Sequence, residues 1–135
     1  MNVADELAIR NLIARIAWET DTWKSVEVYL VNCTEDFSWQ WGDVIYRGHE
    51  GMARRMREVL EQGICGPGVP ARHCIASMEV IADPNDPDTA RVRSMALMLS
   101  VKDGQPSGAL YGDYHDTVRR VDGKWLIAKR VVGMI

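Results

Sequence analysis

The stretch GDYHDTVRRVDGKWLIAKRVV, residues 112–132, gives the clearest indication of the fold. Its Asp-Gly pair at 122–123 stands between two segments with strand-like alternation, and Asp-Gly is a preferred pair for a tight β-hairpin turn. The pattern predicts two long strands, at 107–121 and 124–134. The end of the chain is therefore expected to form antiparallel sheet.

The segments before this hairpin extend the sheet. Two further strands are predicted at 71–82 and 90–102, separated from their neighbours by the turn sequences DPNDPDT and KDGQPS. A short hairpin is predicted near 37–47, where Phe37, Trp39 and Trp41 alternate with polar residues.

The first half of the chain has helical spacing instead. Helices are predicted at 3–20, at about 22–32 and at 49–61, and a Gly- and Pro-rich loop follows at 62–70. A long meander beside only three helices should curl around them. We expect an α+β fold, with a cone-shaped, curved antiparallel sheet packed on three N-terminal helices, and residues 1–135 as a single domain. Such a cone encloses a pocket.

Composition excludes several functions. The net charge of −3 gives no electrostatic basis for nucleic-acid binding. The basic cluster Arg54, Arg55 and Arg57 is followed by acidic residues, which predicts a solvated helix face rather than a phosphate site. No apolar run reaches membrane-spanning length, so we expect no membrane partner. Phosphate-loop, metalloprotease and nucleophile-elbow motifs are absent, so we expect neither a metal nor another cofactor.

The cysteines and the first residues bear on location. The chain has 3 cysteines without CxxC spacing, which favours reduced thiols, with Cys33 and Cys74 as small buried residues. The start MNVADELAIR has neither a basic lead nor an apolar core, so no signal peptide is expected. Both observations predict a cytoplasmic protein.

The strand PARHCIASMEV, residues 70–80, begins with a histidine. His73 shares its side of the strand with a mixed set of residues, whereas the opposite side is apolar. A bulge near Cys74 or Ile75 would turn His73 toward the interior. On spacing alone, His73 is better explained as a core or strand-end histidine bound by a backbone carbonyl.

Four strings resemble the SnoaL-like group of the nuclear transport factor 2-like superfamily, which includes scytalone-dehydratase-like proteins. They are AIRNLIARIAWETD, YRGHEGMARRM, ARHCIASMEV and the closing hairpin quoted above. The matching positions include Asp21, His73, Tyr114 and Asp116. The resemblance implies a conical pocket, often with an Asp–His pair, in lyases, isomerases and polyketide-type cyclases acting on small cyclic carbonyl compounds. Unlike the dehydratase-like members, this chain has no histidine in its next strand.

The site residues follow from this resemblance. Asp21 would orient His73 as acid or base, with Glu19 as the second choice of partner, although Asp21 could instead simply cap a helix. Tyr114 and Asp116 would face the pocket from one side of a strand, or else form a surface ladder. The expected substrate-binding residues are large and mostly aromatic: Trp18, Trp39, Trp41, Tyr46 and Met98.

The resulting hypothesis is a cofactor-independent lyase or isomerase, of dehydratase or cyclase type. It would act by proton transfer on a small apolar or cyclic carbonyl or hydroxy compound in an apolar pocket. The alternative is a non-catalytic domain of the same fold that binds a small ligand or another subunit. Both faces of the strand at 90–102 are apolar, which predicts a homodimer packed sheet to sheet.

Overall fold

The computed structural model describes residues 1–133 and confirms the predicted α+β architecture. Its elements, in chain order, are α1 Val3–Thr22, α2 Val26–Leu30, β1 Cys33–Trp41, β2 Val44–Arg47, α3 Gly48–Glu61, β3 Ala71–Asp83, β4 Asp86–Lys102, β5 Gln105–Val121 and β6 Lys124–Gly133. The second helix is shorter than predicted and begins at Val26. Residue 134 of the predicted last strand lies outside the described residues.

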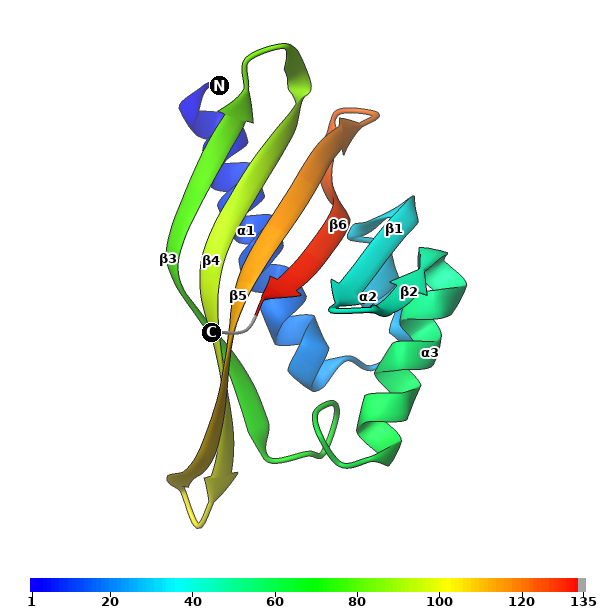
Figure 1. The fold of residues 1–135 in the computed structure, drawn as a ribbon, viewed down its shortest axis with the longest axis vertical. Coiled ribbons are helices and arrows are strands. Elements are labelled where there is room, and N and C mark those ends of the chain that lie inside the picture. The colour runs from blue at the N-terminus through cyan, green and yellow to red at the C-terminus, as the bar shows by residue number, and fades with distance from the viewer. Residues whose placement is uncertain (134–135) are drawn as a thin grey trace.

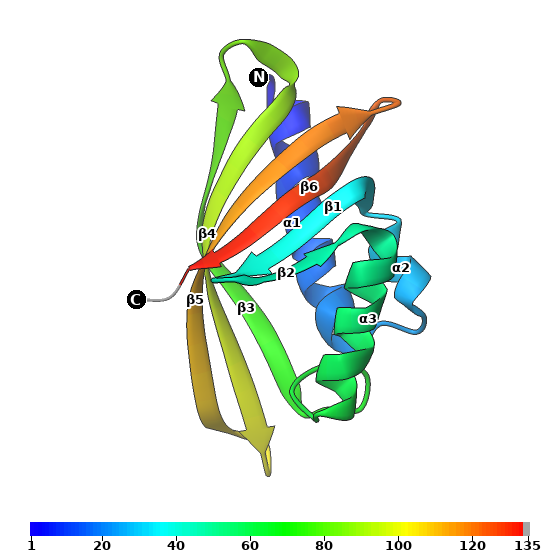
Figure 2. The ribbon, with the colours of Figure 1, turned by 45° about the vertical axis from the view of Figure 1, so that its right-hand side comes forward.

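The strands form one curved, six-stranded sheet in the order β2-β1-β6-β5-β4-β3 (Figure 1). Neighbouring strands are antiparallel except β1 and β6, which run parallel. Figure 2 shows the helices gathered on one side of this sheet, and the β4–β5 hairpin projecting beyond the rest of the molecule. The projecting strands and the loop after α3 thus lie at one end of the fold, away from the N-terminus.

The core lies between α1 and the concave face of the sheet. Apolar residues of α1 recur at helical spacing and are fully buried, namely Ile9, Leu12, Ile13 and Ile16. They pack with residues from the sheet that include Phe37, Val92, Val118 and Ile127. Leu7, also on α1, is exposed.

A bulge in β3 decides which side chains reach this core. The register with β4 shifts between Ala76 and Glu79, and Ser77 has a φ of 50°, in the left-handed region. An extra residue there reverses the inward and outward sides of the strand. The side chains that point inward are therefore those of His73 and Ile75 before the bulge and of Met78 after it. The predicted bulge near Cys74 or Ile75 was misplaced, and Cys74 is exposed rather than buried.

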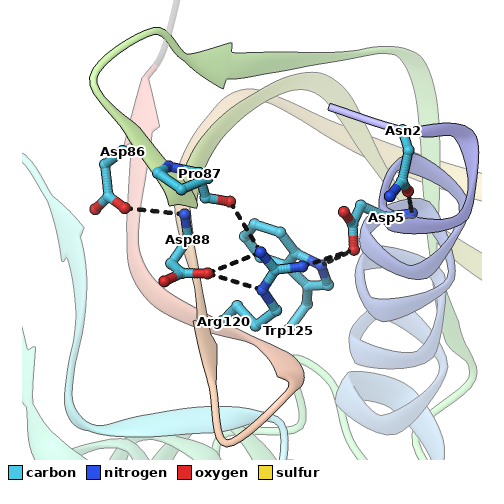
Figure 3. A network of polar contacts seen from close by, with 7 residues as sticks. All are labelled: Asn2, Asp5, Asp86, Pro87, Asp88, Arg120 and Trp125. Carbon is cyan, nitrogen blue, oxygen red and sulfur yellow. Dashed lines mark hydrogen bonds and ion pairs between the residues drawn. The ribbon is translucent and has the colours of Figure 1, made fainter.

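A polar network ties the start of α1 to the start of β4 and to the β5–β6 hairpin (Figure 3). The Asp5 carboxylate accepts hydrogen bonds from the Arg120 guanidinium at 3.1 Å and from the Trp125 indole at 3.0 Å. Arg120 also pairs with Asp88 at 2.8 Å. Asn2 caps α1 by accepting a hydrogen bond from the Asp5 backbone N–H. These contacts fix α1 lengthwise on the sheet, and so fix where its far end lies.

Candidate functional site

The far end of α1 brings Asp21 against His73 on β3. The Asp21 Oδ1 atom lies 2.7 Å from the imidazole Nδ1, and the backbone N–H of His73 donates to Asp21 Oδ2 at 2.6 Å. His73 thus engages both carboxylate oxygens of Asp21. The Asp21 side chain is 2% exposed and that of His73 is 12% exposed, so water competes little for these bonds.

Helical geometry places Asp21 there. It lies in the last turn of α1, four residues after Ala17 and five after Ile16, and so continues the side that faces the sheet. The alternative, that Asp21 caps the next helix, does not hold, because Asp21 lies within α1 and α2 begins only at Val26. Glu19 makes no hydrogen bond with His73 among the described residues, so the structure pairs His73 with Asp21.

The pairing also fixes the imidazole tautomer. A carboxylate only accepts hydrogen bonds, so Nδ1 carries the proton and donates it to Asp21. In the neutral ring Nε2 then holds a lone pair. A nearby aspartate that orients an imidazole in this way also stabilises the cation formed when Nε2 takes up a proton. The arrangement is that of an oriented base or acid.

His73 lines a cavity of about 130 Å³. Its wall is mostly apolar and comes from the β-strands and from the loop after α3, with Ile64, Ala96, Met98, Leu110 and Val132 among the lining residues. Polar groups in the wall are few, notably His73, Tyr114 and Arg55. A small, mostly apolar cavity with a few polar groups is the usual form of a small-molecule site.

Tyr114 supplies a hydroxyl to this cavity from β5. Burial raises the pKa of Tyr114 above its ordinary value of 10.0, although the positive charges of Arg130 and Arg55 oppose the shift. The phenol therefore stays protonated at neutral pH and can donate a hydrogen bond. The Arg130 guanidinium carbon lies 3.9 Å from the centroid of the Tyr114 ring, which holds the ring in place.

Asp116, predicted to act beside Tyr114, has another role in the structure. Arg130 donates two parallel hydrogen bonds to its carboxylate, at 2.8 and 2.9 Å, and both side chains are almost fully buried. Burial alone would lower the pKa of Arg130, but the charge of Asp116 and its hydrogen bonds raise it above the ordinary value. Asp116 is not among the residues that line the cavity with His73. It joins β5 to β6.

The predicted substrate-binding residues divide into two groups. Trp39, Trp41 and Met98 line the cavity. Trp18 does not, because its side of α1 faces solvent and the residue is 64% exposed. Tyr46 does not line the cavity either; its hydroxyl donates to Glu58 at 2.7 Å, and its ring packs edge-on against Trp39.

Arg55 lines the cavity, so its predicted place on a solvated helix face was wrong. Arg54 and Arg57 are exposed as expected, but Arg55 is half-buried and lines the cavity. Its spacing gives the signal, since it lies three residues after Met52 and four before Val59 on the apolar stripe of α3. Cys65 also lines the cavity, and burial raises the pKa of its thiol, which therefore stays protonated.

Comparison with known families places the chain. A family model described as a SnoaL-like domain matches residues 1–131. The chain belongs to the SnoaL-like domain family. The resemblance predicted from its sequence is confirmed. Residues 1–133 of this SnoaL-like protein contain no group of three or more His, Cys, Asp or Glu side chains suited to a metal ion. No helix in the described part is long and apolar enough to cross a membrane.

Solved structures share the fold of this SnoaL-like protein. A protein of unknown function with a cystatin-like fold from Nostoc punctiforme has a TM-score of 0.82 at 24% identity, covering 98% of this chain and 92% of that one. A candidate scytalone dehydratase from Novosphingobium aromaticivorans has a TM-score of 0.75 at 24% identity, covering 97% and 84%. A type 2 hexachlorocyclohexane dehydrochlorinase, LinA, has a TM-score of 0.76 at 20% identity, covering 98% and 86%. No curated protein matches the chain in sequence.

Proposed function

We propose that this SnoaL-like protein is a cofactor-independent lyase or isomerase. It would transfer a proton on a small cyclic carbonyl or hydroxy compound held in the cavity. The observation that carries the proposal is the Asp21–His73 pair, buried at one wall of a mostly apolar cavity. Two of the fold neighbours are named for eliminations, a dehydratase and a dehydrochlorinase, which supports the same class of chemistry.

The proposed chemistry begins at His73. Its Nε2 lone pair removes a proton from carbon next to a carbonyl, and the Asp21 carboxylate stabilises the imidazolium that forms. The Tyr114 hydroxyl donates a hydrogen bond to the substrate oxygen, where negative charge develops. Such a donor acts more strongly in a site from which water is excluded. The imidazolium then returns its proton, either to another carbon or to a leaving hydroxyl.

The apolar wall has a part in the same proposal. Trp41 and Met98 offer flat or adaptable contact surface to a ring, and Trp39 forms part of the same wall. The cavity of about 130 Å³ suits a compound of one or two small rings rather than a polymer. Asp116 is left out of the chemistry because Arg130 occupies its carboxylate.

The test follows exchange and elimination in deuterated water by NMR, with a panel of small cyclic ketones and hydroxyketones. The wild-type protein should react with members of the panel, and His73→Ala should lower the rate about 10²- to 10⁴-fold, the range for loss of a general base. His115→Ala is the matched control because His115 is exposed on β5, and it should retain the rate. An active His73→Ala protein with a native melting profile would refute the proposal. Binding without turnover in the wild-type protein would favour the non-catalytic alternative.

We also propose that the protein is a cytoplasmic homodimer, with the domain 1–135 as its unit. Met95 and Leu97 on the outer face of β4 are 46% and 36% exposed, and the exposed Cys74 on β3 pairs with Leu97 in the sheet. A second copy would cover this apolar patch. Light scattering at micromolar concentration should give twice the chain mass, and a monomer mass would contradict the proposal.

A further inference from the structure

Arg55 presents a cation to the cavity from the middle of α3. Its guanidinium carbon lies 3.6 Å from the centroid of the Trp39 ring, so the guanidinium lies against the indole. Stacking of this kind leaves the N–H groups at the edge of the guanidinium free to donate. A donor that is stacked in this way is also restricted in its direction.

The support behind Arg55 is itself held in place. Trp39 packs edge-on against Tyr46, with ring centroids 6.0 Å apart. The Tyr46 hydroxyl donates to Glu58, which also accepts a hydrogen bond from Arg54 at 3.1 Å. Arg55 therefore rests on a fixed aromatic surface, and a ligand would meet a guanidinium that is already oriented.

Arg55 has no acidic partner among residues 1–133. Each of the other arginines that are at least partly buried pairs with an aspartate or glutamate, namely Arg10, Arg119, Arg120 and Arg130. The acidic groups near the cavity are already engaged. Glu58 is bound by Tyr46 and Arg54, and Asp21 by His73.

An unpaired cation in such a place is unfavourable unless an anion arrives. Burial lowers the pKa of Arg55, which reflects this cost. The guanidinium is charged before any reaction begins, so it matches a ligand that is already anionic, whereas the neutral Tyr114 phenol matches a carbonyl. The planar fork of N–H groups fits the two oxygens of a carboxylate.

We propose that the cavity takes a small cyclic carboxylate, whose carboxylate group pairs with Arg55 while its ring lies against Trp41 and Met98. The proposal rests on the proposed function in treating this ligand as the substrate. It adds the substrate class, a cyclic acid that also carries the reacting carbonyl or hydroxyl.

The test measures binding without turnover, by isothermal titration with benzoate, benzamide and phenyl phosphate as probes. Benzoate should bind the wild-type protein about 10- to 100-fold more tightly than benzamide, the gain typical of hydrogen bonds to a charged group. Arg55→Met keeps a long side chain against Trp39 but removes the charge, and should abolish this preference. Arg57→Met removes the same charge from an exposed position on the same helix, and should leave the preference for benzoate intact. Arg55→Lys keeps the charge without the fork and should retain part of it.

Several results would overturn the inference. They are equal binding of benzoate and benzamide by the wild-type protein, an undiminished preference in folded Arg55→Met, and tighter binding of phenyl phosphate than of benzoate. The wild-type comparison holds even where a variant fails to fold. His73→Ala should still prefer benzoate, since binding needs no proton transfer. Loss of turnover in His73→Ala without any benzoate preference in the wild-type protein would overturn the Arg55 assignment and leave the proposed function standing.

Discussion

Replacement of Asp21 by asparagine is the most informative change at the site. The side chain keeps its shape, but one acceptor oxygen becomes an NH₂ donor. Asp21 accepts from two N–H groups of His73, at 2.7 and 2.6 Å, so an asparagine can satisfy only one of them. If its oxygen keeps the backbone N–H, the NH₂ group faces Nδ1, and the imidazole proton must move to Nε2. The lone pair then no longer faces the cavity.

The two consequences have different sizes. Loss of the correct tautomer and of the negative charge should lower turnover by about 10²- to 10⁴-fold. The free energy of unfolding should fall by about 1–3 kcal/mol, because a charge-assisted hydrogen bond is lost at a side chain that is 2% exposed. At a temperature where the variant is folded, the loss of turnover is therefore much larger than the loss of stability can explain.

Urea denaturation and initial rates on the same preparations separate the two effects. Glu19→Gln is the matched control, since it makes the same chemical change in the same turns of α1 without touching His73. It should change the free energy of unfolding by less than about 0.5 kcal/mol and leave turnover intact. An Asp21→Asn protein with wild-type turnover would refute the reasoning, as would a Glu19→Gln protein with the same loss.

Two other changes test the interior. Asp116→Ala should lower the free energy of unfolding by about 3–5 kcal/mol, because it leaves Arg130 buried without its partner; a loss below about 1 kcal/mol in urea denaturation would contradict the structural role of the pair. Burial raises the pKa of Tyr29 above its ordinary value of 10.0, so the stabilising effect of its proton is complete below about pH 10 and is lost as the pH rises toward the folded-state pKa. In the Tyr29→Phe protein, the free energy of unfolding should therefore fall less steeply with pH above about pH 10, by up to about 1.4 kcal/mol per pH unit. Equal slopes for the wild-type and variant proteins in alkaline melts would contradict this prediction.

The local pattern predicted the fold well because the helical spacing of the first half and the two-residue alternation of the later strands are both clear. The spacing of Leu12, Ile13 and Ile16 and the Asp-Gly turn at 122–123 each indicate one kind of structure. The bulge at Ser77 could not be placed in advance. A positive φ at a serine has no local signal, and the bulge depends on how β3 meets β4.

The site was predicted in part, and the errors in that prediction have separate causes. The Asp21–His73 contact came from the family resemblance, since no local rule joins residues so far apart in sequence. The pairing of Asp116 with Arg130 depends on the register of β5 and β6, which the hairpin pattern alone did not reveal. Arg55 was assigned to a solvated face because its neighbours in sequence are charged, although its helical spacing places it inside.

The position of the imidazole proton tests the central claim most directly, because it needs no substrate. Two-bond ¹H–¹⁵N correlation NMR of His73, at a pH where the ring is neutral, reports which nitrogen is protonated. We predict a protonated Nδ1, bound to Asp21, and an unprotonated Nε2 facing the cavity. A proton on Nε2 with Nδ1 bare would contradict it, because the nitrogen toward the cavity would then have no lone pair with which to act as a base.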